Sequence, residues 1–98
     1  MSIVVLTERT GPVTTITLNR PDKRNALNVE LLEQLCAAVT AAESDRTQRI
    51  LVLRGAGSVF CSGLDLAEAA HPERALASAE LVGKSLRALA TLKSLLQL

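Results

Sequence analysis

Aromatic side chains are almost absent from this sequence. Phe60 is the single aromatic residue, and neither Trp nor Tyr occurs among the 98 residues. Hydrophobic residues nevertheless make up 48% of the chain, so any core must be built from Leu, Val, Ile and Ala. A chain of this length has the size of one small domain and buries a smaller share of its surface than a longer chain. We therefore expect one domain with an aliphatic core.

The sequence also has no excess of charge of either sign. Its 11 Lys and Arg residues against 10 Asp and Glu give a net charge of +1, and the basic residues are scattered along the chain. Nucleic-acid and membrane-surface binding need clustered Lys and Arg, so we expect neither kind of partner. No apolar run reaches membrane-spanning length, and the first residues lack the features of a secretory signal. The expected location is the cytoplasm.

Cysteine is scarce as well. Cys36 and Cys61 are too far apart for a C-x-x-C motif and too few for a disulfide framework. Cys61 and the single histidine, His71, could be read as a nucleophile and its base, but their spacing carries little geometric information. We expect Cys61 to pack in the interior and His71 to face solvent. The Gly-Ala-Gly at 55–57 lacks the third glycine and the following helix of a dinucleotide-binding loop.

Two segments near the N-terminus are rich in β-branched residues. They are residues 3–9 and residues 13–18, and a Thr-Gly-Pro turn separates them. This pattern predicts an antiparallel hairpin. Pro21 cannot donate a hydrogen bond to a sheet and should end the second strand.

Apolar residues recur at helical spacing from Leu31 to Ala42. Asn28 is a suitable N-cap, and Glu30 suits the positive end of a helix. We predict a helix that begins after Asn28 and ends near Glu43.

Residues 50–53, ILVL, follow a polar loop and are apolar on both faces. They predict a parallel strand that is covered on both sides and is reached by a right-handed crossover. Further along, apolar residues recur every three or four positions from Val82 to Leu96, which predicts a second amphipathic helix that starts near Pro72. Neither Gly nor Pro stops that helix, so we expect a truncated end.

Two segments carry a pattern that reaches beyond secondary structure. Residues 16–28 read ITLNRPDKRNALN, and residues 50–66 read ILVLRGAGSVFCSGLDL. Both are similar to sequence blocks of the crotonase family, the enoyl-CoA hydratase/isomerase group, in the same order and at the same spacing. The resemblance implies an α/β fold, the N-terminal part of a crotonase-like superhelix of β-β-α turns, with an antiparallel hairpin at its start and two amphipathic helices. Residues 1–98 would form a partial domain of this kind.

The resemblance also implies a site for an acyl-CoA thioester. In the family two backbone N–H groups polarise the thioester carbonyl, and one of them follows the glycine of the second block. Here that donor is Leu64, after Gly63. A developing enolate oxygen needs preorganised donors, and a glycine lets the backbone approach the ligand. The resemblance assigns the coenzyme A and substrate contacts to Lys23, Arg24, Ala26, Ser62, Asp65 and Leu66.

The chain departs from the family pattern at two points. Ser62 stands where relatives often have Ala, which changes the polarity of the site but leaves the backbone donor. By the resemblance, the family's second oxyanion donor and its catalytic Glu or Asp residues are expected to lie beyond Leu98. Asp65 and Glu68 could act as acid and base, but we expect Asp65 to cap a helix start instead.

The resulting functional hypothesis is a lyase or isomerase of fatty acid metabolism that acts on an acyl-CoA. By resemblance it needs no metal or redox cofactor and forms a homotrimer or hexamer. Hydration, isomerisation and hydrolysis reuse the same oxyanion hole, so the acyl chain and the reaction stay open. One alternative is a truncated, catalytically incompetent remnant that at most binds coenzyme A or an intact homologue. Another is an interaction module that binds a partner through the leucine face of its last helix.

Overall fold

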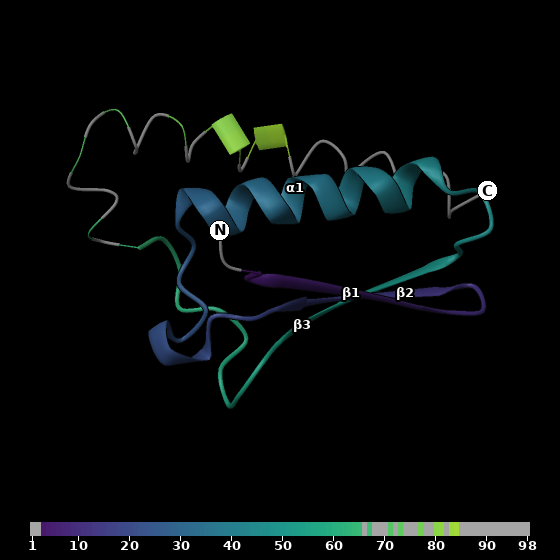
Figure 1. Ribbon diagram of the computed structural model, residues 1–98, viewed down its shortest axis with the longest axis horizontal. Coiled ribbons are helices and arrows are strands. Elements are labelled where there is room, and N and C mark those ends of the chain that lie inside the picture. The colour runs from purple at the N-terminus through teal and green to yellow at the C-terminus, as the bar shows by residue number, and fades with distance from the viewer. Residues whose placement is uncertain are drawn as a thin grey trace.

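Within the described residues, a long helix packs on a three-stranded sheet. The computed structural model describes residues 3–65 and positions 67, 71, 73, 77, 80, 81, 83 and 84. Its elements are, in order, β1 (Val5–Thr10), β2 (Val13–Leu18), the 3₁₀ turn η1 (Pro21–Lys23), α1 (Val29–Ser44) and β3 (Ile50–Gly55). The strand order is β1-β2-β3, and Figure 1 shows α1 lying along one face of this sheet.

The first two strands form the antiparallel hairpin that the sequence predicts. Their register runs from the Val5–Leu18 pair to the Thr10–Val13 pair. Gly11 in the connecting turn has a φ of 57°, a left-handed conformation that glycine adopts at little cost. The turn between the strands therefore lies at the Thr-Gly-Pro segment, as predicted.

The third strand pairs with β2 in parallel, also as predicted. The expectation that both of its faces are covered is wrong for the part of the chain that the structure describes. Ile50 is 52% exposed and Val52 is 40% exposed. Successive side chains of a strand point to opposite faces, and both residues lie on the face opposite α1. The apolar pattern thus predicted the strand correctly but not what covers it.

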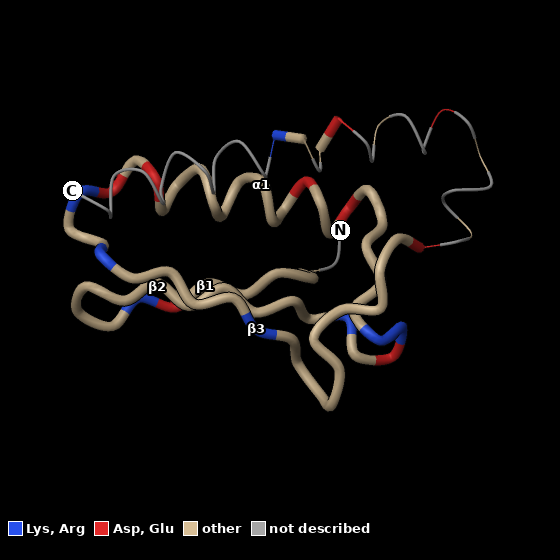
Figure 2. The backbone as a smooth tube through the Cα atoms, turned by 180° about the vertical axis from the view of Figure 1, so that it is seen from behind, with Lys and Arg blue, Asp and Glu red and all other residues tan. Residues whose placement is uncertain are grey.

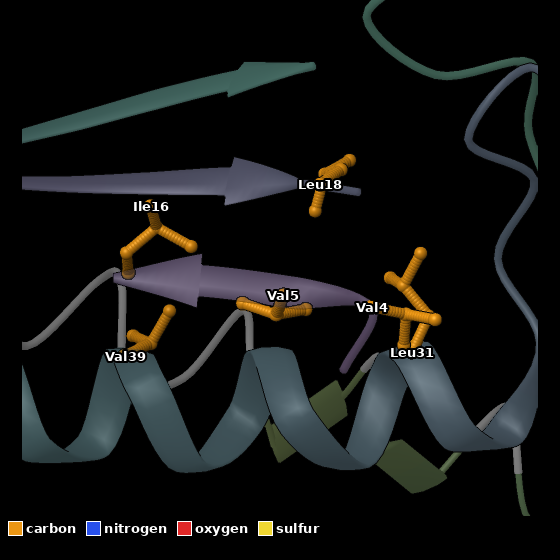
Figure 3. Close-up of a cluster of buried hydrophobic side chains, with 6 residues drawn as sticks. All are labelled: Val4, Val5, Ile16, Leu18, Leu31 and Val39. Carbon is orange, nitrogen blue, oxygen red and sulfur yellow. The ribbon is translucent and has the colours of Figure 1, made fainter. Parts of the chain in front are cut away.

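Aliphatic side chains from β2, α1 and the start of β1 form the core, as the composition requires. Figure 3 shows Leu31 and Val39 pointing from α1 toward the strands, and the Ile16 side chain extending from β2 toward α1. All three are fully buried. The complete buried cluster is Val4, Val5, Ile16, Leu18, Leu31 and Val39.

The helix α1 begins where the sequence places it. Asn28 has an extended backbone, and its Oδ1 accepts a hydrogen bond of 2.9 Å from the Leu31 N–H. Glu30 lies in the first turn, where its negative charge interacts favourably with the helix dipole. The helix ends at Ser44, one residue later than predicted.

The second predicted helix lies largely outside the described residues. Of its segment, positions 73, 77, 80, 81, 83 and 84 are described, and all of them are helical. None of the helices in the described part of the chain is both long and apolar enough to cross a membrane.

We predict that Asn28→Ala lowers the free energy of unfolding by about 1 kcal/mol, because the Leu31 N–H loses its acceptor. Asn28→Asp keeps an oxygen at this position and should retain most of the stability. Urea denaturation followed by circular dichroism measures both variants. Equal losses would show that the cap is not what stabilises the start of α1.

Candidate functional site

Two loops lie side by side at one end of the sheet, as Figure 1 and the reverse view in Figure 2 both show. One comprises residues 19–28 and follows β2; the other comprises residues 56–65 and follows β3. The two strands are parallel, so their carboxyl ends reach the same edge of the sheet and deliver both loops there. The two sequence blocks that carry the family resemblance therefore meet in space.

A short parallel bridge between Leu27 and Leu64 joins the loops. The Leu27 N–H donates to the Gly63 carbonyl at 2.8 Å, and the Asp65 N–H donates to the Leu27 carbonyl at 2.9 Å. In a planar trans peptide the C=O and N–H groups point in opposite directions. Since the Gly63 carbonyl points at Leu27, the Leu64 N–H of the same peptide points away from it. This N–H donates to no acceptor within the described part of the chain.

Gly63 provides the conformation that this arrangement requires. Its φ is 99°, a value that side-chain-bearing residues rarely adopt. No described atom lies within 4 Å of the position that a Cβ at Gly63 would occupy. Leu64 is 52% exposed as well. The glycine is thus needed for the backbone turn rather than for close packing, and the space beside it is open.

Asn25 ties the two loops together from the inside. It is fully buried and has a φ of 57°. Its Oδ1 accepts from the Arg20 N–H at 2.8 Å, while its Nδ2 donates to the carbonyls of Ala56 at 3.0 Å and Val59 at 2.7 Å. One acceptor and both donors of the amide are therefore used. The role of Asn25 was not predicted from the sequence, although Asn in a tight polar loop often adopts a positive φ.

Gly55 allows the second loop to fold back onto the end of β3. A Cβ at this position would overlap the carbonyl oxygens of Val59 and Phe60. These atoms belong to the backbone, so the loop itself would have to shift to admit a Cβ. The Val59 carbonyl is also an acceptor for Asn25, so the contact at Gly55 helps to place that acceptor.

Arg20 and Asp65 form an ion pair between the loops. The distance from Arg20 Nη1 to Asp65 Oδ2 is 3.1 Å, and the two side chains are only 16% and 17% exposed. The same Nη1 donates to the Ala26 carbonyl at 2.7 Å. Asp65 Oδ1 accepts from the Ala67 N–H at 2.9 Å, which is the capping contact that the sequence favoured over an acid/base role.

Most of the other site residues that the sequence predicts also lie on the two loops. Lys23 and Arg24 are exposed, and Figure 2 shows the basic residues of this loop gathered beside the second loop. The Arg24 carbonyl accepts from the Ser62 N–H at 3.1 Å. Ala26 is half-buried. The remaining predicted contact, Leu66, lies outside the described residues.

Cys61 and His71 have the structural roles that the sequence predicts for them. Cys61 is partly buried and packs against the core, and its sulfur accepts from the Gly63 N–H at 3.4 Å. His71 is exposed. Glu68, the other candidate acid, lies outside the described residues. Where the chain is described, no group of three or more His, Cys, Asp or Glu side chains could hold a metal ion.

Comparison with known proteins finds consistent relatives. A family model described as enoyl-CoA hydratase/isomerase matches residues 8–96. The chain is 43% identical to a probable enoyl-CoA hydratase of Mycobacterium leprae, over 74% of this chain and 32% of that protein. It is 48% identical to the 1,2-epoxyphenylacetyl-CoA isomerase of Escherichia coli, over 55% of this chain and 21% of that protein.

The structural comparison agrees. The crystal structure of an enoyl-CoA hydratase/carnithine racemase from Magnetospirillum magneticum matches with a TM-score of 0.79 and 35% identity, over 90% of this chain and 35% of that one. The chain thus spans about a third or less of the length of these relatives.

The buried amide of Asn25 generates a stability prediction. Asn25→Gly keeps the positive φ but leaves two carbonyls and one N–H without their partner, so the free energy of unfolding should fall by about 2 kcal/mol or more. Asn25→Ala should lose further stability because alanine disfavours a positive φ. Chemical denaturation measures both losses. A wild-type stability for Asn25→Gly would show that the amide does not hold the loops.

Proposed function

The chain belongs to the enoyl-CoA hydratase/isomerase family, and from this premise we propose that it takes part in processing an acyl-CoA thioester. In this proposal the Leu64 N–H donates to the thioester carbonyl as one member of an oxyanion hole. One observation carries the proposal: this N–H points away from its own bridge and has no acceptor within the described part of the chain. The open space beside Gly63 leaves room for the carbonyl to approach.

The chemistry favours a fixed backbone donor at this point. Negative charge builds up on the thioester oxygen as the acyl group becomes enolate-like, and a hydrogen bond to a charged oxygen is stronger than one to a neutral carbonyl. A donor that is already oriented needs no reorganisation when the charge appears. The hydrogen bond from Leu27 to the Gly63 carbonyl supplies this orientation, because it fixes the peptide plane that contains the Leu64 N–H.

The first loop is proposed to hold coenzyme A. Lys23 and Arg24 are exposed cations on the loop that the Leu27–Leu64 bridge joins to the donor. They suit the nucleotide phosphates, which bind point charges and guanidinium groups well. Backbone groups around Ala26 and Ser62 would contact the pantetheine arm, together with Asp65 and Leu66 at the acyl end. The coenzyme A thioester is the substrate here, and no metal or redox cofactor is invoked.

Hydration of an α,β-unsaturated acyl-CoA is the first reaction to test, and double-bond isomerisation is the second. We assign no residue of this chain to the proton transfers, because Asp65 already binds Arg20 and Ala67. The proposal also includes a cytoplasmic location and assembly into trimers or hexamers. The rival hypothesis of a binding remnant predicts that coenzyme A binds without turnover.

The decisive variants are at Leu64. With crotonyl-CoA as substrate, we predict that Leu64→Pro lowers kcat/KM of the purified protein by about 100-fold or more, because proline removes the N–H. Leu64→Ala keeps the N–H, trims an exposed side chain and should stay within a few-fold of the wild type. Loss of the enoyl thioester absorbance measures the rate. Equal losses in the two variants would contradict a backbone mechanism, and binding without turnover in the wild type would favour the remnant hypothesis.

The basic loop makes a separate prediction about binding. Lys23→Glu combined with Arg24→Glu should weaken coenzyme A binding, most strongly at low ionic strength, because the cation–phosphate attraction becomes repulsion. Arg46→Glu combined with Arg49→Glu changes the net charge equally on the loop between α1 and β3, and it should leave binding unchanged. Calorimetric titration with coenzyme A at several salt concentrations measures both. An unaltered affinity in the first variant at low salt would remove Lys23 and Arg24 from the site.

A further inference from the structure

The bridge that orients the Leu64 N–H is short, and its Gly63–Leu64 side is exposed. It consists of two hydrogen bonds, and one of its partners, Gly63, is an exposed glycine with the largest conformational freedom of any residue type. An isolated pair of hydrogen bonds near solvent opens readily. Rotation of the Gly63–Leu64 peptide would turn the Leu64 N–H away from a bound carbonyl. A donor that must be preorganised therefore needs further support at this point.

Arg20 lies where such support would act. Its Nη1 donates both to the Ala26 carbonyl at 2.7 Å and to Asp65 Oδ2 at 3.1 Å. Ala26 is the residue before Leu27, and Asp65 is the residue after Leu64. One guanidinium nitrogen thus links the two chain segments directly next to the bridge, on the N-terminal side of Leu27 and on the C-terminal side of Leu64.

The carboxylate of Asp65 is held at both oxygens. Oδ2 contacts Arg20, and Oδ1 accepts from the Ala67 N–H. The Asp65 N–H is also committed, because it donates to the Leu27 carbonyl. Both side chains of the ion pair are mostly buried, so solvent screens their attraction less than it would at the surface. The backbone on the C-terminal side of Leu64 is therefore fixed through main chain and side chain together.

We propose that Arg20 and Asp65 are positioning residues that hold the Leu64 N–H in the orientation for polarising the thioester carbonyl. This inference rests on the proposed function and adds two side chains to it. Arg20 has no substrate contact in the proposed function, and the Asp65 carboxylate is already bound to Arg20 and to the Ala67 N–H. Arg20 also differs from its neighbours Lys23 and Arg24, because its guanidinium is directed to Ala26 and Asp65 and is mostly shielded from solvent.

A positioning role predicts a specific kinetic pattern. The Leu64 hydrogen bond strengthens as charge develops on the oxygen, so a misplaced donor weakens the transition state more than the bound substrate. Loss of the ion pair should therefore lower kcat and leave KM and coenzyme A affinity within a few-fold of the wild type. Damage to the coenzyme A loop would instead raise KM. The split between kcat and KM separates the two roles.

The test variant is Asp65→Asn in the purified enzyme. Asparagine keeps an oxygen for the Ala67 N–H but removes the charge that pairs with Arg20. We expect kcat to fall by about 10- to 100-fold, up to the cost of misplacing a reacting group by about 1 Å and less than the cost of losing one oxyanion donor outright. Arg20→Gln should behave alike. The kcat of the double variant should be no lower than that of the less active single variant, because the two residues act as one unit.

Vibrational spectroscopy reports the hydrogen bond directly. A non-reacting acyl-CoA analogue with an isotope-labelled thioester carbonyl should show a lower C=O stretching frequency when it is bound to the wild type, since hydrogen bonding polarises the carbonyl. The shift should be smaller in Asp65→Asn. A loss of global stability alone would not change the frequency of ligand bound to the folded fraction. Thermal melts confirm that each variant is folded under the assay conditions.

The chain offers a matched control in its other described ion pair. Arg9 Nη1 lies 2.7 Å from Asp45 Oδ2, between β1 and the end of α1 and away from both loops. Hydrogen bonds from the Thr47 hydroxyl and N–H, and to a lesser degree the Arg9 guanidinium, hold the pKa of the Asp45 carboxyl below its ordinary value. Asp45 is therefore charged at neutral pH. Asp45→Asn breaks this ion pair and should leave kcat and the carbonyl frequency unchanged.

The outcomes separate this inference from the function on which it rests. A folded Asp65→Asn variant with wild-type kcat and wild-type frequency would overturn the positioning role and leave the proposed function standing. Absence of any carbonyl shift in the wild type would overturn both. If Asp65→Asn does not fold, Asp65→Glu replaces it, because the added methylene displaces the carboxylate but keeps its charge. A wild-type frequency and kcat in that variant would count equally against the proposal.

Discussion

The site depends on one buried amide group. Asn25 bonds to the backbone of its own loop and to two carbonyls of a loop that lies more than 30 residues further along the chain. A buried polar group that lost these partners would be costly, so the folded state keeps the two loops together. The Leu27–Leu64 bridge and the Arg20–Asp65 ion pair also join the two loops, and they fix the backbone on either side of Leu64. The proposed coenzyme A loop and the proposed donor loop form one unit for this reason.

The proposed chemistry of the site depends on the backbone rather than on the side chains that line it. The proposed donor is a main-chain N–H, and its direction follows from the peptide plane that Leu27 fixes. The side chains of Ser62 and Leu64, which flank Gly63, are exposed and lie outside the core. The residues that shape the site are instead partly or fully buried behind it. Their contribution is to limit the conformations of a short backbone segment.

The sequence predicted what local patterns encode. The hairpin, the cap at Asn28 and the parallel strand β3 follow from turn chemistry and hydrophobic period, which act over a few residues. The family resemblance pointed to Gly63 and Leu64. The roles of Arg20 and Asn25 in joining the loops were not predicted. Their partners on the second loop are more than 30 residues away in the sequence, and no local pattern identifies a partner at that distance. The covering of β3 was misjudged because an apolar strand pattern does not identify what packs on each face.

The contact at Gly55 has an evolutionary consequence. Backbone atoms of the next loop occupy the volume of a missing methyl group, so even the smallest side chain would push the loop off the strand. A lineage can drift at Ser62 and Leu64, where side chains meet open space, and still inherit the same peptide geometry. At Gly55 even a substitution by alanine would disturb the loop. Descendants that diversify their substrates should therefore vary at Ser62 and Leu64 and keep Gly55 unchanged.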